Sequence, residues 1–190
     1  MVAAAWHDEG VEEHALVVAL RAGDRVAFAS LVEREAASVH RSCLRILGSI
    51  QDAEDVTQEA FVTAFRSMRT YRGDGSLRAW LLRIAQRIAF RRLRQRRATL
   101  DLDAVPEGRL ADSSTDPTRA VVARESRVTV REAVAALPEP YREAVALRFF
   151  GDLSLAEVAE STGRPLNTVK THLRRGLERL RPVLGETSVS

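Results

Sequence analysis

Apolar residues at helical spacing fill two stretches of this 190-residue chain and lapse between them. From residue 11 to residue 97 they recur at steps of three and four, which is the period of an amphipathic helix. Glycine-containing turns divide this stretch into four helices. They are predicted at about 11–22, 25–47, 51–70 and 77–97. The same spacing resumes near residue 119 and runs to 184, so the sequence predicts an all-α protein.

Residues 99–118 separate the two helical stretches. They carry five acidic residues, two prolines and only one arginine, a composition typical of a flexible linker. We therefore expect two small helical domains joined by a flexible acidic linker. The first is a four-helix domain at 11–98, the linker is 99–118, and the second domain is 119–184.

Composition excludes several classes of protein. Cys43 is the only cysteine, so an intrachain disulfide is impossible and a cysteine-based zinc site is not expected. The four histidines lack metal-binding spacing, and we predict neither a metal nor a cofactor. The N-terminus has no basic segment followed by a long apolar core, and no apolar run reaches the roughly 18 residues of a membrane span. These features predict a cytoplasmic protein.

The second stretch carries the pattern of a helix-turn-helix motif. Ser154 and Glu157 have the spacing of a capping box, and Leu153 with Val158 matches a hydrophobic staple. This short helix meets Gly163, and a longer helix follows. A short helix, a glycine-containing turn and a longer helix are typical of helix-turn-helix proteins.

The longer helix has an apolar face and a polar face. The apolar stripe, expected to face the core, consists of Leu166, Val169, Leu173, Leu177 and Leu180. The polar side carries Asn167, Thr168, Thr171, Arg174 and Arg175, with Lys170 and His172 on its two flanks. Such amide, hydroxyl and guanidinium groups can reach base edges and phosphates in a major groove. The alternative is an ordinary solvated basic helix, but the capped short helix and the turn favour DNA recognition.

The predicted helix 77–97 has eight arginines and no acid between residues 78 and 97. Its buried stripe is predicted to contain Trp80, Leu81, Ile84 and Ile88, and the residues beside or opposite it are Arg83, Gln86, Arg87, Arg91 and Arg94. Uncompensated like charges on one helix repel one another, so this helix favours a polyanionic partner. The glycine-rich loop at 71–76 could approach a single-stranded nucleotide closely. A merely solubilising basic face remains the alternative.

The predicted helix 51–70 has a face of a different kind. Its predicted core residues are Ala53, Val56, Ala60 and Ala64. The far side combines Asp55, Gln58, Glu59 and Thr63 with the apolar Val62 and Phe65. Acidic groups beside exposed apolar ones favour a protein-binding surface, and their charge is wrong for DNA. A soluble acidic helix with Phe65 covered by a neighbour remains possible.

These segments, in this order, resemble extracytoplasmic-function (ECF) sigma factors over about residues 12–184. The strongest match is the string from Asp52 to Phe61, which looks like region 2.2 of that family. The resemblance implies that Asp55, Gln58 and Glu59 contact the clamp coiled coil of core RNA polymerase. We place Val62, on the same face, in this set.

The resemblance also assigns DNA contacts. The segments Tyr71–Asp74 and Trp80–Ala85 look like regions 2.3 and 2.4, which melt and read the −10 element, and 137–175 looks like region 4, which reads the −35 element. The implied −10 contacts are Arg72, Asp74, Ser76, Arg83, Arg87 and Arg91. The implied −35 contacts are Asn167, Thr168, Lys170, Thr171, Arg174 and Arg175. The resemblance further implies promoter DNA and an anti-sigma factor as partners, no enzyme activity, and a linker that threads toward the RNA exit path.

Two other functions are distinguishable from this one. A conventional DNA-binding regulator would bind its site as a free protein, whereas a sigma factor binds strongly only within the polymerase holoenzyme. A DNA-processing enzyme needs clustered carboxylates or an activated nucleophile. The acidic residues of this chain lie instead in the linker or on predicted protein-binding faces.

Overall fold

The computed structural model describes residues 5–71, 73, 76–100 and 117–186, and over these residues it contains helices and no strand. The N-terminal unit comprises α1 (Ala5–Arg21), α2 (Arg25–Leu47), α3 (Ile50–Ser67), the 3-10 turn η1 (Met68–Thr70) and α4 (Leu77–Leu100). The C-terminal unit comprises α5 (Pro117–Ala136), α6 (Tyr141–Phe149), α7 (Leu155–Thr162) and α8 (Leu166–Glu186). The predicted all-α fold is confirmed. Helices α4 and α5 each extend two residues into the predicted linker, and residues 101–116 lie outside the described part.

Local sequence signals fix where the helices begin and end. The Asp24 carboxylate accepts hydrogen bonds from the backbone N–H of Val26 at 2.7 Å and of Ala27 at 3.3 Å, so it caps α2. Gly48 ends α2 with a φ of 69°, a left-handed conformation that glycine adopts without strain. Ser49 then caps α3. The turns between α1, α2 and α3 therefore follow from short polar residues and glycines in the sequence.

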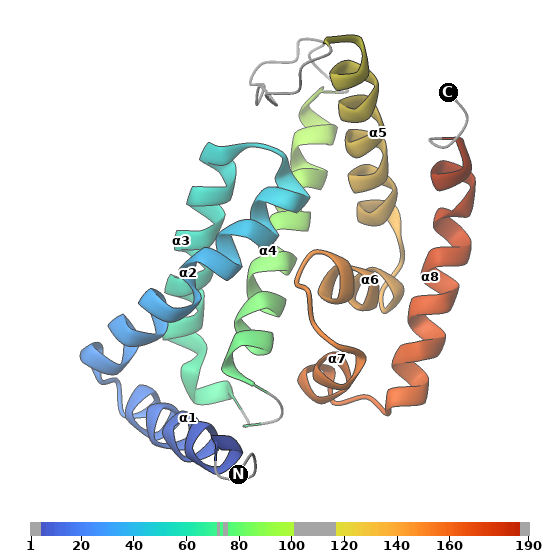
Figure 1. The fold of residues 1–190 in the computed structure, drawn as a ribbon. Helices are drawn as coiled ribbons and strands as arrows, with labels where there is room; N and C mark the ends of the chain where they lie inside the picture. The colour runs from blue at the N-terminus through green and yellow to red at the C-terminus, as the bar shows by residue number, and fades with distance from the viewer. Residues whose placement is uncertain (1–4, 72, 74–75, 101–116, 187–190) are drawn as a thin grey trace.

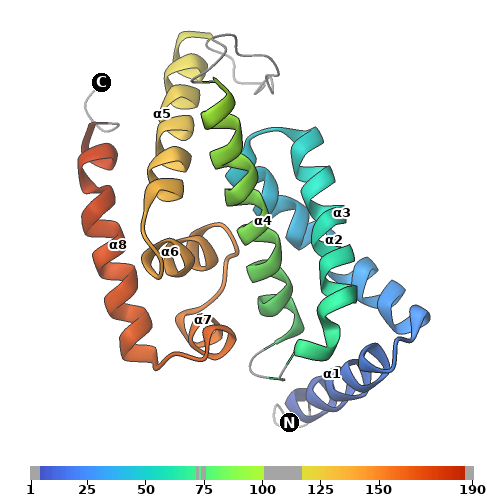
Figure 2. The ribbon, with the colours of Figure 1, turned by 180° about the vertical axis from the view of Figure 1, so that it is seen from behind.

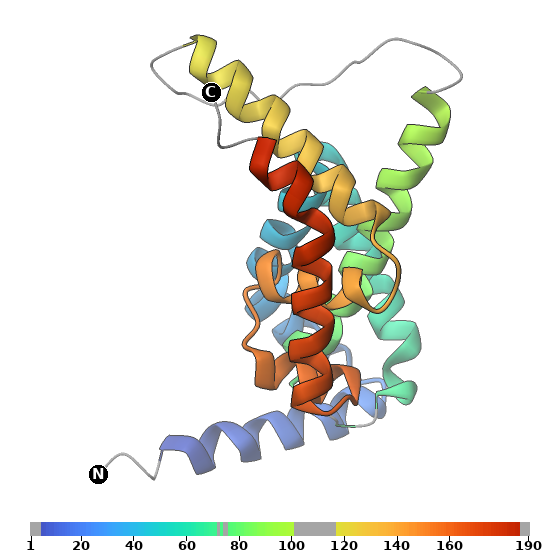
Figure 3. The same cartoon turned by 90° about the vertical axis from the view of Figure 1, so that its right-hand side faces the viewer.

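Helix α4 lies in the middle of the molecule (Figures 1 and 2). It packs against α2 and α3 on one side and against α5, α6 and α7 of the C-terminal unit on the other. Helix α8 lies outermost and packs on α5, α6 and α7. Helix α1 runs across the end of the N-terminal unit and projects beyond it (Figure 3).

A single apolar cluster joins the two units. It includes Val39 and Leu82 from the N-terminal unit and Leu147 and Leu153 from the C-terminal unit, all fully buried. The rings of Phe90 and Phe150 meet across the boundary with centroids 6.2 Å apart. The two units share a core in this structure, an arrangement that the sequence did not predict.

Most predicted core positions are confirmed. Ala53, Val56, Ala60 and Ala64 of α3 are buried, as are Leu81, Ile84 and Ile88 of α4, while Trp80 is half-buried. The prediction for α8 is only partly correct. Val169 and Leu180 are buried and Leu173 and Leu177 are half-buried, but Leu166 is 41% exposed.

Candidate nucleic-acid interface

The helix-turn-helix motif forms as predicted. The Ser154 hydroxyl accepts a hydrogen bond from the Glu157 N–H at 3.2 Å, and the Glu157 carboxylate accepts one from the Ser154 N–H at 2.8 Å, which completes the capping box of α7. Gly163 ends α7 in the left-handed region with a φ of 65°. Helix α8 begins three residues later, so a short turn fixes the angle at which it leaves α7.

The six predicted −35 residues lie together along the N-terminal half of α8. Asn167, Lys170, Arg174 and Arg175 are exposed, and Thr168 and Thr171 are half-buried. Arg174 pairs with Glu178 at 2.6 Å on the exposed surface, a contact too weak to withhold the guanidinium from a phosphate. Among the ion pairs of the described residues, none involves Lys170 or Arg175. This face of α8 can therefore meet DNA without rearrangement.

His172 faces α6 and not the polar surface of α8. Its ring meets the Tyr141 ring edge-on at 5.8 Å, and the Arg179 guanidinium lies 4.6 Å from the centroid of the same tyrosine. Burial lowers the pKa of His172, and Arg164 and Arg175 lower it further, whereas Glu143 raises it. The imidazole is therefore neutral at pH 7, and it positions α8 on α6.

Six of the arginines of α4 fall into two groups, and the prediction that the arginines of this helix are uncompensated is wrong. Three of them turn toward α3 and pair with acidic side chains there. Arg91 pairs with Glu59 at 2.7 Å, Arg92 with Asp55 at 3.2 Å, and Arg96 with Asp52 at 2.6 Å. A count of charges within one helix could not reveal these partners, because the acids belong to the neighbouring helix.

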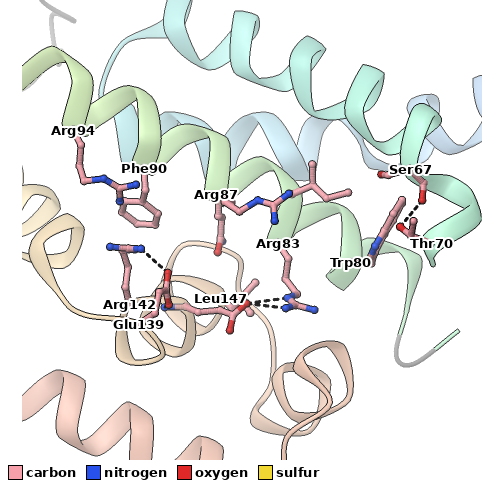
Figure 4. Close-up of a pocket in the computed structure, with 13 residues that line it drawn as sticks. Ser67, Thr70, Trp80, Arg83, Arg87, Phe90, Arg94, Glu139, Arg142 and Leu147 are labelled. Carbon is pink, nitrogen blue, oxygen red and sulfur yellow. Dashed lines mark hydrogen bonds and ion pairs between the residues drawn. The ribbon is translucent and has the colours of Figure 1, made fainter. Parts of the chain in front are cut away.

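The second group of α4 arginines faces the C-terminal unit. Arg83, Arg87 and Arg94 line a cleft of about 270 Å³ between α4 and α6 (Figure 4). The Arg83 guanidinium binds Glu143 of α6 at 3.0 Å and the Ser161 carbonyl of α7. Burial lowers the pKa of Arg94, and the nearby Arg142 lowers it further. Glu139 raises the pKa of Arg94 and lines the same cleft with Glu143, so arginines and glutamates are mixed on this side of α4.

The predicted polymerase-binding residues lie on one surface of α3. Asp55 and Gln58 are exposed, Glu59 is half-buried, and Val62 is 48% exposed. The neighbouring Phe65 is 41% exposed, and its ring stacks edge-on against Phe28 of α2 at 4.9 Å. The two carboxylates pair with arginines of α4 on the exposed surface, where such pairs are weak. This surface of α3 therefore offers a partner both acidic groups and the apolar Val62 and Phe65.

The predicted −10 loop is only partly described. Arg72 and Asp74 lie outside the described residues, whereas Ser76 caps α4 by accepting a hydrogen bond from the Ala79 N–H at 3.2 Å. Helix α1 holds both flanks of this loop. The Glu13 carboxylate accepts a hydrogen bond from the Leu77 N–H at 2.7 Å, and Arg21 donates one to the Tyr71 carbonyl. Sequence periodicity gave no signal for these contacts, because they join residues more than 45 positions apart.

The burial, clustering and hydropathy of the described residues bear on thiol reactivity, metal binding and membrane insertion. Burial raises the pKa of the Cys43 thiol to about 11, only partly offset by a hydrogen bond with Thr57, so the group stays protonated and unreactive. No cluster of three or more potential metal ligands occurs among the described residues. The described helices also include none with the length and hydropathy of a membrane span.

Together, the helix-turn-helix motif and the arginine-rich α4 are the features of a DNA-binding protein. Family models match at residues 31–99 (Sigma-70 region 2) and 127–180 (Sigma-70, region 4). The chain is 32% identical to the ECF RNA polymerase sigma factor SigW of Bacillus subtilis, over 87% of this chain and 92% of that protein. It is also 32% identical to the ECF RNA polymerase sigma-E factor of Escherichia coli, over 90% and 93%. The chain belongs to the ECF family of RNA polymerase sigma factors, which recognise promoters.

Two solved structures are similar in fold. One, of CnrH in complex with the cytosolic domain of CnrY, has a TM-score of 0.56 at 22% identity and covers 92% of this chain and 97% of that one. The other shows the sigma factor RpoE in complex with the anti-sigma factor NepR from Bartonella quintana. Its TM-score is 0.51 at 20% identity, and it covers 83% of this chain and 96% of that one.

Proposed function

We propose that this sigma factor binds core RNA polymerase through α3, opens −10 DNA with α4 and the loop before it, and reads −35 DNA with α8. It supplies no catalytic group, and the polymerase makes the phosphodiester bonds. The observation that supports this division of labour is that one chain presents three chemically different surfaces. These are the apolar and acidic surface of α3, the arginine surface of α4, and the polar helix-turn-helix surface of α8.

The same proposal places the protein in the cytoplasm and gives it an anti-sigma factor as a regulator. The second part rests on the two similar structures, since one is a complex with the cytosolic domain of CnrY and the other a complex with an anti-sigma factor. A conventional DNA-binding regulator is disfavoured by the match to Sigma-70 region 2, which covers residues 31–99 and includes α3 and most of α4.

Reconstitution with core polymerase tests the function directly. Run-off transcription from genomic fragments should start at defined promoters only when this chain is present, and removal of the −10 or the −35 sequence should stop it. Absence of any start site, or strong promoter binding by the free chain without polymerase, would refute the proposal.

Val62 provides a specific prediction for the polymerase surface. Val62→Glu should weaken binding to core polymerase at least tenfold, because it places a charge in the apolar centre of the interface. The fold should persist, since exposed substitutions change stability by about 0.5 kcal/mol or less and Val62 is 48% exposed. Polymerase affinity is measured by fluorescence anisotropy, with Glu54→Gln on the same helix as the exposed control. Equal affinities for the two variants would place the polymerase contact elsewhere.

A second prediction separates base reading from phosphate binding on α8. Arg175→Ala should change which −35 bases are preferred, because a bidentate arginine–guanine contact contributes about 1–3 kcal/mol of discrimination. Lys170→Ala should weaken all promoters nearly equally, since a phosphate contact carries no sequence information. Selection from randomised −35 sequences with each holoenzyme distinguishes them. The opposite pattern would show that α8 is rotated in the groove.

A further inference from the structure

The closed arrangement of the two units is incompatible with simultaneous binding of both promoter elements. Helix α8 packs on α6 and α7, and these pack on α4. With about 8–10 Å between the axes of packed helices, α8 lies within about 20 Å of α4. The −10 and −35 elements are about 25 base pairs apart, which is about 85 Å along B-DNA. The two units must therefore separate before α4 and α8 can both contact a promoter.

Glu143 joins α4 of the N-terminal unit to the helix-turn-helix of the C-terminal unit. One of its oxygens accepts hydrogen bonds from the Arg83 guanidinium of α4 at 3.0 Å, and the other binds Arg164 in the turn before α8 at 2.6 Å. The Glu143 side chain is 21% exposed and that of Arg83 is 34% exposed, so solvent screens the pair only partly. Arg83 also donates to the Ser161 carbonyl, so its donors are occupied by α6 and α7.

Two further contacts reinforce the closed arrangement away from Glu143. The Gln86 amide of α4, 4% exposed, donates to the Ser42 hydroxyl of α2 at 3.0 Å and to the Ala146 carbonyl of α6 at 3.2 Å. On the exposed surface, Arg45 of α2 binds the Asp152 carboxylate. The boundary between the units thus combines its apolar core with a buried hydrogen-bonded amide and an exposed ion pair. Such boundaries open more readily than wholly apolar ones.

We propose that Glu143 is an autoinhibitory latch that keeps the free sigma factor closed by occupying Arg83, a residue needed for −10 binding. This inference rests on the proposed function. The −35 surface of α8 stays exposed in the closed form, whereas Arg83 becomes available only when the units part. The latch therefore controls −10 binding and leaves −35 binding unaffected. The apparent affinity for −10 DNA equals the affinity of the open form multiplied by the fraction of molecules that are open.

Fluorescence energy transfer on the full chain measures the opening. Dyes are attached to introduced cysteines at two exposed positions, Glu33→Cys on α2 and Ala156→Cys on α7. The native Cys43 is buried, with its pKa raised to about 11, and does not compete for the dyes. Loss of a charge-assisted contact should raise the ratio of open to closed molecules about tenfold. Glu143→Gln should therefore lower energy transfer, whereas the exposed control Glu160→Gln should not.

DNA binding by the same proteins completes the test. Glu143→Gln should bind a short −10 single strand, taken from a promoter found by run-off transcription, about tenfold more tightly than the unmodified chain, with unchanged binding to a −35 duplex. Asp152→Asn removes the Arg45 contact. It should also lower energy transfer and tighten binding of the −10 single strand. Unchanged energy transfer in Glu143→Gln, or opening without tighter −10 binding, would overturn the latch. A failure of run-off transcription by the unmodified chain would instead refute the proposed function and leave the measured closure intact.

Discussion

Val169→Asp is expected to unfold the C-terminal unit. Val169 is 1% exposed and belongs to the apolar cluster beneath α8. An aspartate there would bury an unpaired carboxylate, which costs about 3–5 kcal/mol or more. Whole domains are stable by only about 5–15 kcal/mol, and this unit is small. Urea unfolding followed by circular dichroism should show an early transition, and hydrogen exchange should locate it in α6, α7 and α8.

Leu166→Asp is the matched control for that substitution. Leu166 belongs to the same predicted stripe of α8, but it is 41% exposed and is the first residue of the helix. A carboxylate at a helix N-terminus is stabilised by about 0.3–1 kcal/mol by the helix dipole, which offsets part of the lost apolar contact. The midpoint of unfolding should move little. Equal losses of stability in the two variants would show that Leu166 packs into the core as Val169 does.

The contrast between Val169 and Leu166 shows where sequence periodicity stops being informative. A helical repeat identifies one face of α8, but it does not say how far along that face a neighbouring helix extends. The ends of helices are determined by local rules, so Ser154 and Gly163 could be interpreted correctly without a structure. Those rules involve residues within four positions of one another.

Contacts between the two units could not be predicted in the same way. Gln86 is a polar residue on a helix rich in arginine, and a solvated position was the natural expectation. It is buried because α6 packs over it, and Gly151 allows that approach: a Cβ there would lie 3.0 Å from the Gln86 side-chain nitrogen. Arg83 and Arg91 have similar surroundings in sequence, yet they bind acids on different helices, Glu143 of α6 and Glu59 of α3. Only the three-dimensional packing separates their roles.

The predicted DNA-binding residues also differ in how far the sequence alone could group them. The six predicted −35 residues all lie on α8, so one helix is enough to bring them together. The predicted −10 residues Ser76, Arg83 and Arg91 meet three different environments, namely a helix cap, the boundary between the units and the acidic side of α3. Residues on one element can be grouped from its period, whereas residues whose partners come from other elements cannot.

Gly176→Leu is expected to disable −35 recognition while leaving the N-terminal unit folded. Gly176 lies where α8 crosses α6, and a Cβ at this position would lie 2.7 Å from the Val145 Cγ2 atom and 3.5 Å from the Tyr141 Cβ atom. Val145 is 2% exposed and is enclosed by its neighbours. A leucine must therefore push α8 away from α6. Overpacking of this kind costs about 1–3 kcal/mol and displaces the backbone, and the adjacent Arg175 would move with it.

Gly185→Leu on the same helix separates the effect of packing from that of helix propensity. A Cβ at Gly185 meets nothing within 4 Å, and replacing a helical glycine stabilises a helix by up to about 1 kcal/mol. Thermal unfolding should therefore be unchanged or slightly higher for Gly185→Leu and several degrees lower for Gly176→Leu. Holoenzyme carrying Gly176→Leu should lose at least tenfold in affinity for a −35 duplex while its binding to core polymerase is retained. Equal unfolding temperatures and −35 affinities for the two variants would show that close packing at Gly176 does not set the position of α8.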